Sequence, residues 1–334
     1  MFSDLMSLAD KMQGCRVMII GDMLADVYLE GKVSRISREA PVLILEHTGE
    51  VVIPGGAANT VHNAATLGGI VLAIGVIGQD STGSELIRVL GNKGVITDGL
   101  VIDELRPTIT KTRVMAGGQA TVRQQIVRID RDTGKPLSPL TEETLLNWVK
   151  TNINGVSAVV ISDYGSGTVT SSIRSWVVDT CQAKKIPSLV DSRYNIAAYS
   201  GITLAKQNEA EAATALGLKM IDANEMDQAG VELLERINAE AVLITRGPAG
   251  MSLFEKSREP VHMPVTNKSE VYDVTGAGDT VVATMALALA AGATYMEAAS
   301  MANLAAGVVV RKPGTATITP QELRKAIEGY YENY

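Results

Sequence analysis

The sequence predicts an α/β fold built on a mainly parallel β-sheet, with a small second sheet attached to it. Short apolar runs alternate along the chain with stretches of helical periodicity, a pattern typical of parallel strands joined by crossover helices. Two β-rich segments interrupt this alternation, and both fall between α/β elements. We therefore expect one sheet that forms the core and a smaller sheet inserted into it.

The first strand of the core is expected in residues 16–21, where an apolar run ends just before Asp22. Apolar runs of this kind suit parallel strands that are buried on both faces. Further strands are expected in residues 71–77, 158–161, 188–190 and 241–244. Helices are expected between them in residues 59–67, 84–90, 141–149 and 171–183.

Four charged residues directly follow apolar runs of the core. Ligands of open α/β sheets bind at the carboxyl ends of the strands, so residues at these positions are candidates for a binding crevice. The four are Asp22, Asp163, Asp191 and Arg246.

The two interrupting segments have the pattern of an accessory sheet. In the second one, Ala116-Gly117-Gly118 separates two strand-like stretches, as a hairpin turn would. We interpret the segments as a lid formed by residues 28–52 and 108–129. The α/β core would then consist of residues 1–27, 53–107 and 130–334.

The composition excludes several classes of partner. Hydrophobic residues make up 46% of the chain and charged residues 20%, and the net charge is −7. An acidic chain without a long basic run binds nucleic acids and membrane surfaces poorly, so neither is expected as a partner. The two cysteines, Cys15 and Cys181, form no CxxC pair, and no apolar leader core is visible near the start. These features favour a cytoplasmic location.

The run Gly276-Ala277-Gly278-Asp279 leads directly into an apolar helical stretch. The first amides of a helix lack partners and attract anions, and glycines let a phosphate approach the backbone. Asp279 then has two interpretations, a helix cap or a general base for a hydroxyl that attacks a phosphate. Taken alone, the tetrapeptide favours the cap.

The longer run from Asp273 to Asp279 resembles the signature of the ribokinase-like (PfkB-type) sugar kinases, and the resemblance spans nearly the whole chain. It implies a ribokinase-like fold, ATP and Mg²⁺ as cofactors, and leaves a monovalent cation open. It also implies that Asp279 is the catalytic base, assisted by the amides of Gly276, Ala277 and Gly278.

Motifs in the first half resemble the sugar-binding elements of this family. The run 21–26 looks like its first strand with a sugar-binding aspartate, Asp26, and the run 54–59 looks like its Gly-Gly-x-x-Asn turn. The resemblance thus implies sugar contacts from Asp26, Gly55, Gly56 and Asn59. Asp163 is a further sugar-site candidate, with a loop cap as the alternative.

Motifs in the second half resemble the nucleotide-binding elements. The run 208–211 looks like the Asn-x-x-Glu motif associated with magnesium and phosphate, which implies a phosphate-side role for Asn208 and a metal role for Glu211 through bound water. The run 245–247 with the following Gly250 looks like the nucleotide-binding turn, and a helix residue matches a position near the adenine. The implied nucleotide contacts are Thr245, Gly247, Gly250 and Asn303.

Residues 34–42 and 108–114 resemble the kinase domain of heptose 7-phosphate kinases in particular. The implied reaction is ATP-dependent phosphorylation at C1 of D-glycero-β-D-manno-heptose 7-phosphate, a step of lipopolysaccharide precursor synthesis. The chain departs from relatives at Ser166, where they often carry lysine, and at Asp191-Ser192-Arg193, where they often read Asp-Pro-Lys. Whether a separate nucleotidyltransferase acts beside it stays open, because the sequence has no such module after the kinase portion.

The lid segments are rich in cations, and this favours a charged substrate independently of the resemblance. The planar guanidinium group of arginine pairs well with phosphate, whereas a neutral sugar needs only hydrogen bonds. The alternative is a solvated lid face. We expect Arg35, Arg113 and Arg128 to contact the sugar phosphate, out of the set Arg35, Arg38, Lys111, Arg113, Arg123 and Arg128.

Alternatives to the heptose reaction remain at this point. One is another PfkB-type activity, such as that of a fructokinase, a ribokinase or a phosphofructokinase. Another is a non-catalytic sugar-phosphate sensor, against which the presence of Asp279 with both glycines argues. The exposed edges of a small accessory sheet also favour a homodimer formed through the lid.

Overall fold

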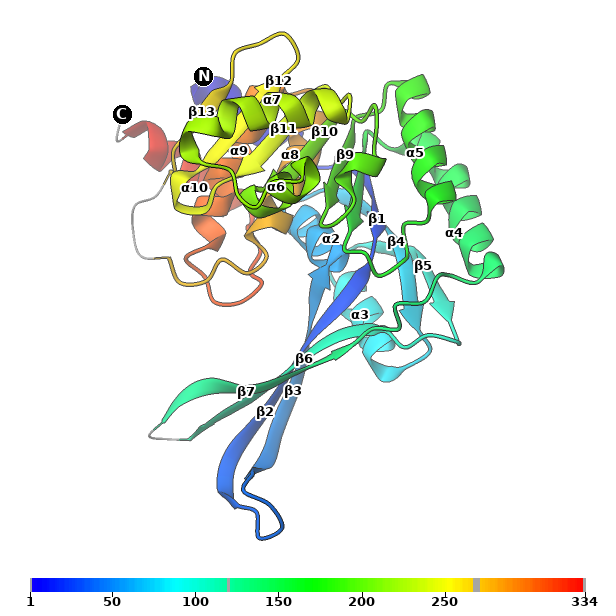
Figure 1. Ribbon diagram of the computed structural model, residues 1–334, viewed down its shortest axis with the longest axis vertical. Coiled ribbons are helices and arrows are strands. Elements are labelled where there is room, and N and C mark those ends of the chain that lie inside the picture. Colours follow the sequence, from blue (N-terminus) through cyan, green and yellow to red (C-terminus); the bar gives the residue numbers. More distant parts are fainter. Residues whose placement is uncertain (1, 119–120, 267–270, 333–334) are drawn as a thin grey trace.

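The computed structural model describes residues 2–118, 121–266 and 271–332. Within this part of the chain a nine-stranded sheet forms the core, and a four-stranded sheet projects from it (Figure 1). The predicted α/β fold with a mainly parallel sheet and a small second sheet is therefore confirmed.

The strands of the core sheet follow the order β13-β12-β11-β10-β9-β8-β1-β4-β5, and only the pairings of β12 with β11 and β13 are antiparallel. Their bounds are β1 (Arg16–Gly21), β4 (Ile70–Gly78), β5 (Ile96–Asp103), β8 (Ala158–Asp163), β9 (Ser188–Ser192), β10 (Leu204–Asn208), β11 (Ala241–Thr245), β12 (Met251–Glu255) and β13 (Val261–Met263).

Helices cover both faces of the core sheet because the strands are apolar on both sides. In β1, Val17 and Ile19 pack into one cluster, whereas Met18 and Ile20 pack into the other. The first cluster contains α1 (Phe2–Lys11), α2 (Ala57–Thr66), α3 (Ser81–Gly91), α8 (Ala277–Ala290), α9 (Tyr295–Val309) and α10 (Pro320–Glu332). The second contains α4 (Pro139–Asn152), α5 (Ser171–Lys184), α6 (Glu209–Leu216) and α7 (Met226–Arg236). Short 3₁₀ turns lie at η1 (Ile153–Gly155), η2 (Ile196–Ala198), η3 (Ala223–Glu225) and η4 (Gly247–Ala249).

The second sheet, which we call the lid sheet, has the strand order β3-β2-β6-β7. It consists of β2 (Met23–Ile36), β3 (Leu43–Gly56), β6 (Ile109–Gly118) and β7 (Thr121–Arg131). The central pair β2 and β6 is parallel, and each edge pair is antiparallel. The lid strands reach further toward the core than the division proposed from the sequence, since β2 and β3 also include residues 23–27 and 53–56.

The lid sheet extends away from the core as a long arm in Figure 1. Its root lies where Met23 pairs with Gly56, and its far end lies where Ile36 pairs with Leu43. Large apolar side chains are exposed along it, among them Val33, Ile36, Leu43, Val51 and Ile129. No helix in the described part of the chain is long and apolar enough to cross a membrane.

Candidate active site

A pocket of about 350 Å³ lies at the carboxyl ends of β8, β9 and β10, against the start of α8. This is the edge at which ligands of parallel α/β sheets bind. The residues that line it are Asp163, Tyr164, Asp191, Arg193, Lys206, Asn208, Glu211, Val274, Gly276, Gly278 and Asp279.

Asp279 is the third residue of α8, and it does not cap that helix. The N-cap position belongs to Gly276, which adopts the left-handed region with φ of +77° and makes no side-chain cap. The carboxylate of Asp279 turns instead toward α2 and the loop after β8, and only 6% of the residue is exposed. The helix-cap interpretation of Asp279 therefore loses its geometric basis.

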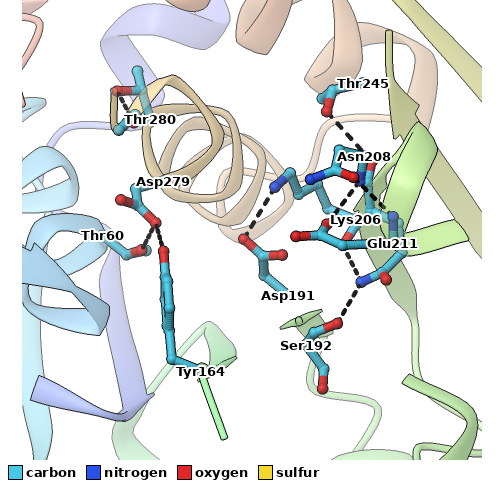
Figure 2. Close-up of polar contacts among 12 residues, drawn as sticks. Thr60, Tyr164, Asp191, Ser192, Lys206, Asn208, Glu211, Thr245, Asp279 and Thr280 are labelled. Carbon is cyan, nitrogen blue, oxygen red and sulfur yellow. Dashed lines mark hydrogen bonds and ion pairs between the residues drawn. The ribbon is translucent and has the colours of Figure 1, made fainter. Parts of the chain in front are cut away.

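Hydrogen-bond donors from two other elements hold the Asp279 carboxylate (Figure 2). Its Oδ2 accepts from Asn59 Nδ2 at 2.7 Å. Its Oδ1 accepts from the Tyr164 hydroxyl at 2.9 Å and from Thr60 Oγ1 at 3.4 Å. Burial raises the pKa of Asp279 to about 6, although the hydrogen bonds from Asn59 and Tyr164 oppose this shift. A carboxylate with such a pKa is ionised at neutral pH and can accept a proton.

Lys206 is a buried cation on β10 that the sequence reasoning missed. Its Nζ donates to Asp191 Oδ2 at 3.1 Å (Figure 2). Burial works against its charge, but the carboxylates of Asp191, Glu211 and Asp279 outweigh burial and raise the pKa of Lys206. A Cβ atom on Gly278 would lie only 2.7 Å from Nζ. The ammonium group thus lies against the glycine turn, where an anionic group of a ligand would be stabilised.

The two departures from the family pattern have different surroundings. The hydroxyl of Ser166 donates to Asp132 Oδ2 at 2.7 Å, so Ser166 holds its loop and supplies no charge. Arg193 lines the pocket, and its guanidinium lies 5.7 Å from the centre of the Tyr194 ring. Cations therefore reach this pocket from β10 and from the loop after β9.

Asn208 and Glu211 form a reciprocal capping box at the start of α6. Asn208 Oδ1 accepts from the Glu211 amide, and Glu211 Oε2 accepts from the Asn208 amide, both at 2.8 Å. Both residues line the pocket, and burial raises the pKa of Glu211. Glu211 is thus no solvated helix-surface residue.

The four other residues expected at the nucleotide lie beyond the pocket lining. Thr245 ends β11 and its hydroxyl donates to the Gln207 carbonyl at 3.4 Å. Gly247 and Gly250 flank the short η4 turn between β11 and β12. Asn303 of α9 donates to the Pro264 carbonyl at 2.8 Å. They surround the antiparallel end of the core sheet.

Asp26 and Arg113 form a buried ion pair at the root of the lid sheet. Arg113 donates to Asp26 Oδ1 at 2.5 Å, across the pairing of β2 with β6. The backbone of Gly55 packs so closely that a Cβ there would lie 2.7 Å from Asp26 Oδ2. Gly56 follows it at the end of β3 and leads into α2, which carries Asn59. The expected sugar-side motifs therefore meet Asp279 through α2.

Asp163 and Asp22 organise the loop after β8. Asp163 accepts from the hydroxyls of Tyr199 and Ser192 and from the Gly165 amide, while it also lines the pocket. The fully buried Asp22 accepts from three backbone amides, those of Tyr164, Ser166 and Thr168.

The remaining cations of the lid sheet are spread over its length. Arg128 is half-exposed and donates two hydrogen bonds to Asp130. Arg35 pairs opposite Ile44 near the far end, where it is exposed and distant from the pocket. Lys111 was not one of the lid cations singled out as ligand contacts. Its Nζ lies 5.7 Å from the centre of the Tyr164 ring. The side chain of Arg123 falls outside the described part of the structure.

Comparison with known proteins gives a family match and several relatives. The description "pfkB family carbohydrate kinase" matches residues 15–322. "Bifunctional protein HldE" of Pelobacter propionicus is 40% identical over 322 residues, which is 96% of this chain and 65% of that protein. The protein of the same name from Geobacter metallireducens is 41% identical over 92% of this chain and 61% of its own. The chain thus spans somewhat less than two thirds of the curated relatives it matches.

Solved structures resemble the fold at low sequence identity. Phosphofructokinase-2 from Escherichia coli, in complex with substrates and products, matches with a TM-score of 0.75 and 20% identity over 95% of this chain and 99% of that one. Arabidopsis thaliana ribokinase, complexed with ribose and ATP, matches with a TM-score of 0.70 and 20% identity over the same shares. These likenesses show that the fold is ribokinase-like.

Proposed function

The chain belongs to the pfkB family of carbohydrate kinases, and we propose that it phosphorylates C1 of D-glycero-β-D-manno-heptose 7-phosphate with ATP. The product would be the 1,7-bisphosphate. Support comes from the segments 34–42 and 108–114, which resemble heptose 7-phosphate kinases, and from the 40% identity to bifunctional HldE. Fructose, ribose and fructose 6-phosphate are the alternative acceptors.

The observation that carries a phosphorylated substrate is the crowding of cations around Asp26. Burial lowers the pKa of Lys111, and the charges of Arg128 and Arg193 lower it further while Asp26 opposes them. Arg113 joins the same group through its ion pair with Asp26. Cations held this close together favour an anionic ligand, because its charge relieves their repulsion. A neutral sugar would leave that repulsion in place.

The arrangement around Asp279 supports a general-base role in phosphoryl transfer. Asp279 would take the proton of the attacking sugar hydroxyl, and its pKa of about 6 keeps it ionised at neutral pH. The amides of Gly276, Ala277 and Gly278 would stabilise the charge on the transferring group, with Lys206 beside them. A non-catalytic sensor would need neither the buried base nor this turn.

Oxygen donors suited to Mg²⁺ line the same pocket, which makes the residues present compatible with the metal. When bound with ATP, Mg²⁺ supplies charge neutralisation between the phosphates. Glu211 would hold metal-bound water, and Asn208 would orient the phosphate side from the start of α6. A monovalent cation is a further proposal, to be tested by comparing potassium with sodium salts.

The lid sheet suggests how two copies would associate. Its exposed apolar residues, among them Val33, Ile36 and Leu43, lie toward the far end of the arm. Burying them against a second lid sheet would remove a large apolar surface from water. We therefore propose a homodimer through the lid, active in the cytoplasm where ATP is the phosphoryl donor.

A coupled kinase assay across a panel of sugars and sugar phosphates tests this function. The panel holds heptose 7-phosphate, fructose 6-phosphate, fructose and ribose, each with Mg–ATP. We expect kcat/KM to be highest for heptose 7-phosphate. A higher kcat/KM for any neutral sugar than for every sugar phosphate would contradict the proposal.

A further inference from the structure

Resting on the kinase activity proposed above, we propose that Tyr164 is a positioning residue that links the lid sheet to the general base Asp279. Three contacts carry this inference. The hydroxyl of Tyr164 holds the carboxylate of Asp279, its ring meets a lysine of the lid sheet, and its loop is tied to both ends of the β6–β7 hairpin.

The first contact is the hydrogen bond from Tyr164 to Asp279. The hydroxyl donates to Oδ1 at 2.9 Å (Figure 2). The other carboxylate oxygen, Oδ2, accepts from Asn59 Nδ2. Burial and the charge of Asp279 hold the pKa of Tyr164 well above its usual range. Tyr164 therefore keeps its proton at every working pH and remains a donor to the base.

The second contact joins the ring of Tyr164 to the lid sheet. Lys111 of β6 places its ammonium group 5.7 Å from the ring centre, a cation–π geometry. Lys111 also lies opposite Asp26 in the pairing of β6 with β2, next to the predicted sugar site. A change in the position of the lid sheet therefore reaches the ring of Tyr164 directly.

The third contact fastens the loop that carries Tyr164. Arg106, which precedes β6, donates to the Ser166 carbonyl at 3.0 Å, and the Ser166 hydroxyl donates to Asp132, which follows β7. Asp22 holds the same loop from the core side through three backbone amides. Both ends of the hairpin thus attach to the short segment that positions Tyr164.

Other charged residues also act on Asp279, Tyr164 and Lys111, and their effects can be separated from that of the lid sheet. Asp191 of β9 and Lys206 of β10 act on Asp279, and Asp191 and Glu211 act on Tyr164. The charges of Asp26, Arg128, Arg193 and Asp130 act on Lys111. An influence of Lys111 on the titration of the base is therefore expected to pass through the Tyr164 ring.

The kinetic test is the pH profile of kcat for Tyr164→Phe, measured with the best acceptor found in the panel. This change removes the donor to Asp279 and keeps the ring. A hydrogen bond to a charged group is worth a shift of about one pKa unit, so the acidic limb should move up by about one pH unit. We expect about a tenfold loss of kcat near pH 5 and about a threefold loss or less at pH 8.5.

Two further variants identify the route. Tyr199→Phe removes another buried tyrosine hydroxyl, which lies at the end of the η2 turn after β9 and donates to Asp163, and should leave the acidic limb in place. Lys111→Met should shift the limb in the wild-type background and not in the Tyr164→Phe background. Equal shifts in both backgrounds would show that Lys111 acts without Tyr164, and this would overturn the link to the lid.

A second readout needs no activity and separates this inference from the proposed function. Since burial raises the pKa of Asp279 from 3.8 to about 6, its ionisation lowers stability as the pH rises from about 4 to about 6. Loss of the Tyr164 hydroxyl should destabilise the protein more when Asp279 is ionised than when it is protonated. The difference in Tm between Tyr164→Phe and the wild type should therefore grow between pH 5 and pH 8. In an Asp279→Asn background that growth should vanish.

A constant Tm deficit across this pH range, together with a wild-type acidic limb, would reduce Tyr164 to a packing residue. If no acceptor is phosphorylated but the Tm deficit grows with pH in the wild-type background only, the proposed function fails. The hydrogen bond between Tyr164 and the Asp279 carboxylate would then still stand.

Discussion

The pocket floor and the lid sheet use charge in opposite ways. The pocket floor, formed by Asp191, Lys206 and Asp279, holds ionised side chains that are buried and have fixed partners, as Lys206 has in Asp191 and Asp279 has in Asn59. Along the lid sheet, charges become more exposed with distance from the core, from the buried pair of Asp26 and Arg113 to the exposed Arg35. The comparison suggests that the floor sets the chemistry and the root of the lid sheet sets the choice of substrate.

Replacing the base should have the largest effect and would test the chemical role of the floor. Asp279→Asn keeps the size of the side chain and removes the proton acceptor, so kcat should fall by about 10²–10⁴-fold. Sugar and ATP affinities should stay within a few-fold because the amides of the turn remain. Asp273→Asn, outside the buried network, should be milder. Retention of more than about a tenth of wild-type kcat by Asp279→Asn would leave no general-base role.

Replacement of the buried Lys206 should have the second-largest effect on kcat and should also lower the stability of the protein. Lys206→Met leaves the carboxylate of Asp191 buried without its partner, which typically costs about 3–5 kcal/mol. We expect a matching fall in the free energy of unfolding by urea titration, and about a hundredfold fall in kcat from lost charge stabilisation. Lys206→Arg is the control that keeps the charge. A stable, fully active Lys206→Met would contradict the account of the floor.

The root of the lid sheet should respond in substrate affinity rather than in turnover. Arg113→Ala removes one partner of a buried pair, a change that costs about 2–5 kcal/mol when a ligand depends on it. The KM for the sugar phosphate should therefore rise by about tenfold or more, with the KM for ATP little changed. An increase confined to the KM for ATP would show that Arg113 serves nucleotide binding and not the choice of sugar.

Variants of Glu211 test whether this pocket residue takes part in Mg²⁺ binding. Glu211→Ala removes a carboxylate from the pocket and half of the capping box at α6. The Mg²⁺ concentration for half-maximal rate should rise several-fold, while loss of the cap should cost about 1 kcal/mol of stability. Glu211→Gln is the matched control, because it can keep the box and loses the charge. Wild-type rates for both variants at limiting Mg²⁺ would exclude the metal role.

The far end of the lid sheet should give the smallest effect. Arg35→Ala changes an exposed residue distant from the pocket. Apart from any effect on dimer formation, kcat/KM per active site should therefore change by less than about twofold. The sequence predicted a substrate contact at this position, and a larger rise in the KM for the sugar would restore that prediction. Sedimentation velocity on the same variant would show whether any loss follows from a weakened dimer.

Five of the nine core strands, β1, β4, β8, β9 and β11, could be predicted from the sequence, because strands buried on both faces are apolar throughout, as β1 and β8 are. The strands β5, β10, β12 and β13 and the helices α6 and α7 lacked so clear a pattern and were not predicted. The turn before Asp279 could be identified because its residues are contiguous.

The contacts that complete the site are not contiguous, and this limited the prediction. Tyr164 and Asp279 are 115 positions apart, and Asp26 and Arg113 are 87 apart. Lys206 carried one usable signal, a lysine in a run that otherwise reads as a buried strand. The position of Arg35 depends on the length of the arm, since each strand residue moves a side chain about 3.3 Å further from the root.

The lid sheet is assembled from two stretches of chain, β2–β3 and β6–β7, with α2 to β5 between them. The seam between the stretches is the parallel ladder of β2 with β6, and the pair of Asp26 and Arg113 crosses it. An engineer who wishes to transplant acceptor preference from another sugar kinase must therefore exchange both stretches as one cassette. A chimaera that receives only one of them would join two unmatched halves across that pair.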